Sequence, residues 1–158
     1  YLKVLPGFQG GHVIGTYNVW APEQGAWFQE DGTALYSPKI YRDIIKPLDE
    51  KISSWWQYNM IHLHPNSFYV LDELLKVPTL KCVQANIDND SITANLIPHF
   101  QKIQNAGKCL LIEARIPWED VKLLLDSLKK EGTLYRLKAN SVEEANALLG
   151  SFLKYHGE

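Results

Sequence analysis

The chain has 158 residues, 46% of them hydrophobic and 22% charged, which is the composition of an ordinary globular domain. Sixteen Lys and Arg against eighteen Asp and Glu give a formal net charge of −2, so the chain lacks the basic field that nucleic-acid binding requires. No apolar run approaches a membrane span and the first residues do not resemble a signal peptide, so we expect a cytoplasmic protein without a membrane partner.

The first 36 residues are rich in Gly, Pro and aromatic side chains and show neither helical nor strand periodicity. We therefore predict an irregular, loop-rich lead-in over residues 1–36, with one short strand near residues 17–20. Because the chain begins with Tyr1 and not with methionine, we also expect it to be a piece of a longer protein. Cys82 and Cys109 each lie within an apolar run, which indicates buried thiols in a reducing compartment.

Residues 37–158 are predicted to form one domain that begins with a helix. Ser37 is a good N-cap, Pro38 suits the first helical turn, and apolar residues then recur at helical spacing as far as residue 56. Pro47 lies inside this helix, where it removes a backbone donor and clashes with the preceding turn. We expect a kink or break at that point.

From residue 58 onward, short apolar strands alternate with helices. The predicted strands cover residues 58–64, 80–87, 108–114 and 133–137, and each is followed by a helix. Four such units require a parallel sheet covered by helices, of the α/β class. The chain contains neither a GxGxxG sequence nor a Walker A sequence, and the pattern alone leaves a barrel and an open doubly wound sheet equally open.

Each predicted strand ends in polar residues, and His62 and His64 are the most informative of these. Residues two apart on a strand face the same side, so both imidazoles are predicted to point into the mouth of a barrel at the strand ends, where catalytic groups gather. With a carboxylate such as Glu113 or Asp88 they could hold zinc or a similar ion. A metal-free catalytic role for His62, His64 and Glu113 is the second interpretation, and a core histidine at position 62 is the third.

A second set of polar and aromatic residues is predicted to contact a small-molecule substrate. For Glu113 and Arg115, an internal ion pair is an equally good explanation. For the aromatic residues near Trp27, the alternative is that they only pack the lead-in against the barrel. Helix capping is the favoured explanation for Asp88, Asn89 and Asp90, since the rest of a calcium loop is missing. The predicted substrate-binding residues are Trp27, Glu30, Asp31, Asn66, Gln84, Asn86 and Arg115.

The segments QEDGTALYSPKIYRDIIKPLDEKI and MIHLHPNSFYVLDELL, followed by a strand that ends in NID, resemble the uroporphyrinogen decarboxylase superfamily. In that family a Ser-Pro pair starts a helix that contains a later proline, and the next strand ends in a His-x-[Cys/His/Ser] element. The matching positions here are Ser37, Pro38, Tyr41, Pro47 and His62. The resemblance spans most of the chain and implies the C-terminal half of a (β/α)₈ TIM barrel.

The resemblance also implies a function, that of a methyltransferase or decarboxylase acting on a small or tetrapyrrole-related substrate, with a corrinoid partner in the methyltransferase case. The methyltransferases hold zinc through a His-x-Cys element and a further cysteine near the last strand. Here His64 takes the second position and no cysteine follows the last strand, so zinc would need His62, His64 and a carboxylate.

A catalytically silent half-barrel is the alternative. Four parallel strands would leave two open edges and an exposed inner face, which favour association. Either a homodimer that closes an eight-stranded barrel or a missing N-terminal half would cover them.

Overall fold

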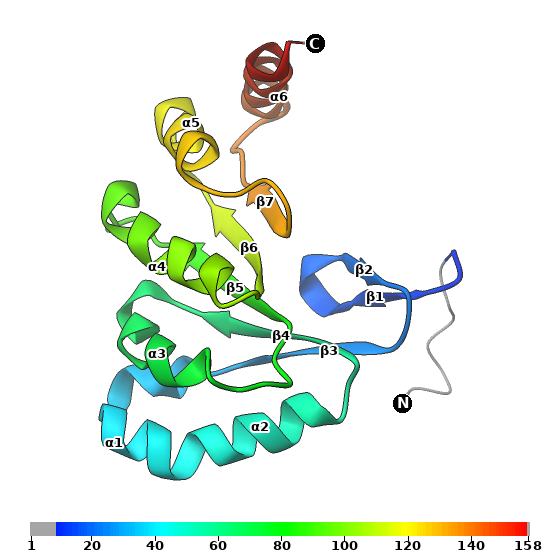
Figure 1. Ribbon diagram of the computed structural model, residues 1–158. Helices are drawn as coiled ribbons and strands as arrows, with labels where there is room; N and C mark the ends of the chain where they lie inside the picture. The colour runs from blue at the N-terminus through cyan, green and yellow to red at the C-terminus, as the bar shows by residue number, and fades with distance from the viewer. Residues whose placement is uncertain (1–8, 158) are drawn as a thin grey trace.

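A parallel five-stranded sheet organises residues 9–157, the part of the chain that the computed structural model describes (Figure 1). Its strands lie side by side in the order in which they occur along the chain. The order is β3 (Gly25–Gln29), β4 (Tyr58–Leu63), β5 (Cys82–Ile87), β6 (Cys109–Ala114) and β7 (Thr133–Leu137). The last four confirm the predicted strands to within two residues at either end.

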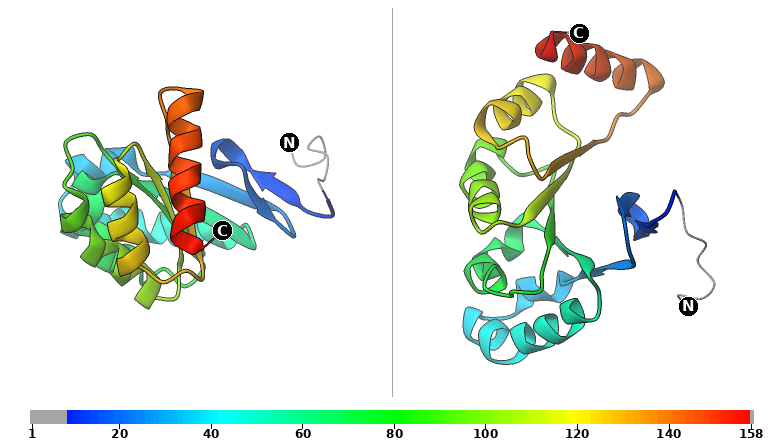
Figure 2. Two further views of the ribbon diagram at one scale, coloured as in Figure 1. Left: turned by 90° about the horizontal axis from the view of Figure 1, so that it is seen from above. Right: turned by 45° about the vertical axis from the view of Figure 1, so that its right-hand side comes forward.

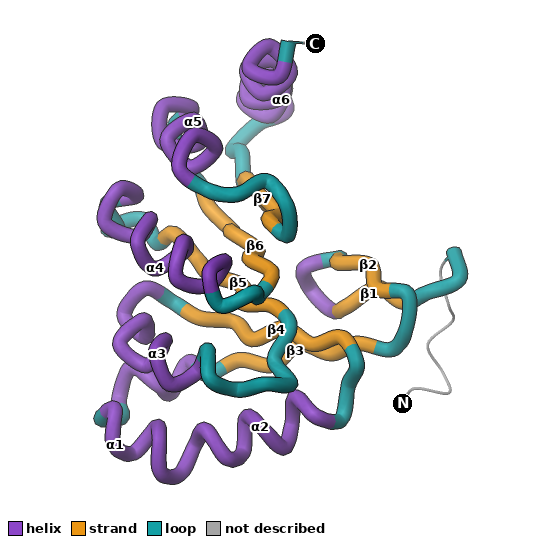
Figure 3. The backbone as a smooth tube through the Cα atoms, viewed as in Figure 1, coloured by secondary structure: helices purple, strands orange, loops and turns teal. Residues whose placement is uncertain are grey.

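The helices between the strands all cover the same face of this sheet, as Figures 1 and 3 show. The right-hand view of Figure 2 shows the strands inside an arc of helices, with the last helix at its upper end. None of the helices described over residues 9–157 is long and apolar enough to cross a membrane. The helices are α1 (Pro38–Ile40), α2 (Lys46–Ser54), α3 (Leu71–Leu74), α4 (Thr93–Asn105), α5 (Trp118–Ser127) and α6 (Val142–His156).

The lead-in differs from the prediction, because it contains three strands. β1 (His12–Ile14) and β2 (Val19–Ala21) form an antiparallel hairpin on the face opposite the helices, and β3 joins the main sheet as its first strand. β2 overlaps the one short strand expected near residues 17–20, whereas the expectation of a loop was wrong for β1 and β3. Residues 1–8 of the predicted lead-in lie outside the described residues. The residues of β3, GAWFQ, do not alternate between buried and exposed, because four of the five are partly buried. The sequence therefore lacks the alternation of apolar and polar side chains that identifies a strand.

The predicted helix start is confirmed, and the irregularity expected near Pro47 is a π-helical turn rather than a break. The Ser37 hydroxyl accepts a hydrogen bond from the Ile40 N–H at 3.2 Å. A π-helical turn over Tyr41–Ile45 then separates α1 from α2, with the Lys46 N–H bonded to the carbonyl of Tyr41. A wider turn directly before Pro47 loosens the contact between the proline ring and the preceding turn, so the helix continues with a local bulge.

Alternation along the strands separates an apolar face from a polar one. On the helix-facing side, Ile61, Val83, Leu110 and Ile112 are completely or almost completely buried in the main core. On the other side the hairpin covers Met60 and Leu111, toward the amino ends of the strands. The side chains beyond that cover are polar, in two rows of register partners: Gln29, His62 and Gln84, then Asn86, Glu113 and Arg136.

Candidate functional site

His62 lies at the carboxyl end of β4 and is 7% exposed. Its Nδ1 hydrogen-bonds the side-chain carbonyl of Gln84 on the neighbouring strand and lies 3.0 Å from the Tyr17 hydroxyl of the hairpin. Gln84 in turn donates from Nε2 to Asn86 Oδ1 at 2.9 Å, which fixes its carbonyl toward the imidazole. The proton of a neutral His62 ring therefore belongs on Nδ1, and Nε2 is left as a free electron pair.

His64 follows directly after β4 and is held in the same way by a carboxylate. Its Nδ1 lies 3.1 and 3.0 Å from the two oxygens of Asp88, which follows β5. The rings of His62 and His64 meet edge to face, with centroids 4.7 Å apart. Each imidazole thus uses Nδ1 to bind a residue from β5 or just beyond it, and each keeps Nε2 available.

Asp31 brings a carboxylate to the two imidazoles. It lies just beyond the end of β3, where Gln29 donates to its Oδ2 at 2.7 Å, and its Oδ1 is 3.8 Å from His62 Nε2. Ligand atoms of Asp31, His62 and His64 all lie within 4.8 Å of one another. Two imidazole nitrogens and one carboxylate oxygen, oriented by Gln84 and Asp88 behind them, are a donor set that fits zinc with one position open.

This set confirms the proximity of the two predicted histidine ligands but changes the carboxylate. Sequence reasoning considered Glu113 or Asp88 as the third ligand and assigned Asp31 to substrate. In the structure Asp88 lies behind His64, and Glu113 points to two cations, one on β7 and one directly after it. The candidate metal-binding group contains Asp31 because β3 pairs with β4 and places residue 31 beside the histidines.

Glu113 is buried at the end of β6 between two cations. Lys138 Nζ lies 2.5 Å from Oε1, and Arg136 Nη1 lies 3.0 Å from Oε2, although it is not aligned for a hydrogen bond. Arg136 also donates to the Thr16 carbonyl at 3.0 Å. An internal ion pair of Glu113 with Arg115 was one sequence interpretation, and it is wrong. Arg136 is the register partner of Glu113, whereas Arg115 lies beyond the end of β6.

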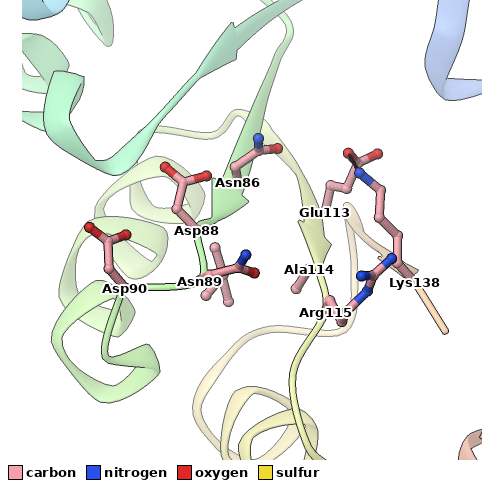
Figure 4. A pocket seen from close by; sticks show the side chains of 9 residues that line it. Asn86, Asp88, Asn89, Asp90, Glu113, Ala114, Arg115 and Lys138 are labelled. Atoms are coloured by element: carbon pink, nitrogen blue, oxygen red, sulfur yellow. Dashed lines mark ion pairs between the residues drawn. The ribbon is translucent and has the colours of Figure 1, made fainter. Parts of the chain in front are cut away.

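A pocket of about 490 Å³ opens beside this cluster, between the loops that follow β5 and β6 (Figure 4). Capping does not account for the acidic loop after β5, because the N-cap of α4 is Ile92 and no side chain bonds to it. The capping prediction for Asp88, Asn89 and Asp90 was therefore wrong. The pocket is lined by Asn86, Ile87, Asp88, Asn89, Asp90, Glu113, Ala114, Arg115 and Lys138.

No protein-family model matches this chain, and no curated protein is significantly similar to it. The family resemblance therefore stays an expectation. The chemistry of the site is inferred from its own residues.

Three of the predicted substrate-binding residues belong neither to the Asp31, His62 and His64 group nor to the lining of the pocket. Trp27 packs edge to face on Tyr17, with ring centroids 5.6 Å apart, in the cluster beneath the hairpin. Asn66 is exposed and accepts a hydrogen bond only from its neighbour Ser67, at 3.3 Å, among the described residues. Glu30 directly follows Gln29, the last residue of β3, and contacts Asp49 of α2 on the helix side of the sheet.

Glu30 forms a buried carboxyl pair with Asp49 of α2, whose Oδ2 accepts a hydrogen bond from the Tyr41 hydroxyl at 2.6 Å. Burial first, and then the Asp49 carboxylate, raise the pKa of Glu30 from 4.5 to about 8. Burial also raises the pKa of Asp49. A protonated Glu30 that donates to Asp49 explains why Asp49 Oδ1 otherwise lacks a hydrogen-bond donor.

Sequence reasoning missed Tyr17, Arg136 and Lys138 as site residues. Tyr17 is 45 positions from His62, and no local pattern connects a hairpin tip to a strand end. Arg136 could have been found from strand register, since it alternates with Tyr135 and Leu137 on β7 and shares a face with Glu113.

Proposed function

We propose that this chain is the C-terminal half of a (β/α)₈-barrel enzyme of the uroporphyrinogen decarboxylase type. In this proposal it is a methyltransferase or decarboxylase acting on a small or tetrapyrrole-related substrate. Asp31, His62 and His64 hold a divalent metal of the zinc type, and the neighbouring pocket receives the substrate.

The arrangement of the sheet supports the barrel part of the proposal. Strands that follow one another in space as in sequence, with every crossover helix on one face, are what a barrel requires, whereas a doubly wound sheet reverses its order and places helices on both faces. The candidate site lies at the carboxyl ends of the strands, where barrel enzymes carry their chemistry.

The convergence of Asp31, His62 and His64 within 4.8 Å is the observation that carries the functional part. These residues come from the ends of two neighbouring strands, and both rings are held by their Nδ1 atoms so that Nε2 stays available. Outer partners of this kind fix the ring orientation and raise the basicity of the ligand nitrogen.

Different residues of the chain would bind the metal, orient its ligands and bind the substrate. When bound, the metal would supply Lewis-acid activation of a substrate oxygen or sulfur atom. Gln84 and Asp88 position the imidazoles, and Arg115 and Lys138 offer positive charge to substrate carboxylates. The Tyr17 hydroxyl, 3.0 Å from His62 Nδ1, closes the site on the hairpin side.

Metal titration of the chelator-treated protein tests this function. Cobalt(II) should bind with a stoichiometry of one and give the visible absorption of a low-coordinate site. His62→Ala, His64→Ala and Asp31→Asn should each abolish that absorption, and His156→Ala, on the exposed end of α6, should leave it unchanged. Retention of the absorption in the two histidine variants would exclude the assignment.

A structural half-barrel that pairs is the second candidate, and α6 favours it. This helix buries none of its fifteen residues, although Leu149 and Leu153 are among the exposed large hydrophobic side chains of the described chain. β3 and β7 are the outer strands of the sheet, with one side of each unpaired within it. A mass measurement in solution would show a dimer if two copies close a barrel, and a monomer would argue against pairing.

A further inference from the structure

The pocket between β5 and β6 has one acidic side and one basic side. Figure 4 shows Asp88, Asn89 and Asp90, from the loop after β5, on one side of the pocket, and Glu113, Arg115 and Lys138 on the other. The two groups come from consecutive loops, so the sheet itself sets them opposite each other. A ligand between them meets opposite charges at its two ends.

Each side of the pocket has side chains that no other group in the described part of the chain occupies. Arg115 is exposed and has no hydrogen-bond or ion-pair partner among residues 9–157. Within the same part of the chain, the side chains of Asn89 and Asp90 are also unpaired, since Ile92 and not an acidic residue caps α4. Arg115, Asn89 and Asp90 therefore take part in neither a helix cap nor an ion pair within this part of the chain.

The charge balance keeps the basic side positive. Glu113 is the one carboxylate there, and it is matched by Arg136 and Lys138 together, at 3.0 and 2.5 Å. Arg115 adds a further positive charge. The acidic side has two carboxylates, of which Asp88 binds His64 and Asp90 is free. A ligand with a single charge would satisfy only one side of the pocket.

From this arrangement we infer that the pocket binds a small zwitterion. Its carboxylate lies against Arg115 and Lys138, and its ammonium group lies against Asp88 and Asp90. The amides of Asn86 and Asn89 add polar contacts between the ends. A volume of about 490 Å³ suits a small molecule, and opposed charges discriminate against ligands that leave one of them unpaired.

This inference rests on the proposed function, because the zwitterion would be the substrate of that same site. Asp88 joins the two, since it lines the pocket and holds His64. Binding of the zwitterion itself needs no metal. Zwitterion binding and metal binding can therefore be tested independently of each other.

The test measures binding of ω-amino acids, from glycine to 6-aminohexanoate, to the chelator-treated full chain by calorimetry. Carboxylates and amines of the same chain length serve as singly charged analogues. We expect at least one amino acid to bind at least about tenfold more tightly than both of its analogues, a difference of about 1.4 kcal/mol. Arg115→Met should remove the advantage over the amine, and Asp90→Asn the advantage over the carboxylate.

Lys130→Met is the matched control, because Lys130 is an exposed cation outside the pocket. It should leave every affinity unchanged. The inference is overturned if no amino acid of the series binds, or if a carboxylate or amine binds as tightly as its zwitterion. Zwitterion binding without cobalt binding would overturn only the metal function, and the reverse result would overturn only the substrate class.

Discussion

The imidazole of His64 and the carboxylate of Asp88 are held together at 3.0 Å although 24 positions separate them in the chain. Both residues directly follow neighbouring parallel strands, β4 and β5, so strand pairing brings them to the same edge of the sheet. The contact occupies Nδ1 of His64. It connects the candidate metal ligands to the pocket that Asp88 lines.

Replacing Asp88 by Asn should weaken metal binding without removing a ligand. The carboxylate orients the His64 ring and increases the basicity of its free nitrogen, and loss of such an outer partner typically costs about 10- to 100-fold in affinity. Zinc titration calorimetry of the two proteins measures the effect. Equal affinities would show that Asp88 does not support a ligand. Asp126→Asn, on α5, is the control.

Replacing Glu30 by Gln should stabilise the protein at alkaline pH. The folded-state pKa of Glu30 is raised to about 8 from 4.5, chiefly by burial, so the folded chain binds more protons than the unfolded chain between these values. Stability from this group is thus present at low pH and is lost as the pH rises toward 8. A neutral amide that donates to Asp49 avoids that loss.

Thermal unfolding at pH 5 and pH 8 checks this expectation. At pH 8 the melting temperature of the Gln variant should exceed that of the parent by roughly 2–4 °C, the shift that about 1 kcal/mol produces in a domain of this size. At pH 5, where Glu30 keeps its proton, the two proteins should differ little. A variant that is less stable at pH 8 would contradict the proton-sharing pair.

Replacing Glu113 by Gln should destabilise the fold. It leaves Arg136 and Lys138 without their shared carboxylate in a cluster where Glu113 itself is almost fully buried. Because both cations are partly exposed, we expect a loss of about 1–2 kcal/mol, below the range for a fully buried pair. Urea unfolding measures it, with the exposed Glu119→Gln as the control. An unchanged midpoint would mean that solvent already screens the cluster.

Much of the sheet could be predicted from the sequence because β4 to β7 are apolar and separated by clear helix signals. Ser37, before β4, shows how clear such signals are, since its hydroxyl accepts the capping hydrogen bond that the sequence predicts. β3 could not be predicted in the same way. It is an outer strand of five residues between loops, and tertiary pairing with β4, rather than local pattern, makes it a strand.

The candidate site was predictable only in part, for the same reason. The spacing of His62 and His64 placed both rings on one face, and the structure brings them together at a centroid distance of 4.7 Å. The third ligand depends on β3, so the role of Asp31 could not be seen before that strand was known. Tyr17 likewise reaches His62 only through the hairpin.

Anomalous diffraction at the zinc absorption edge, from crystals of the chelator-treated protein soaked in zinc, tests whether Asp31, His62 and His64 bind a metal ion. We expect one strong peak within bonding distance of these three residues, with Asp88 still bound to His64 Nδ1. The absence of a peak among these three residues, in crystals that take up zinc elsewhere, would contradict this assignment.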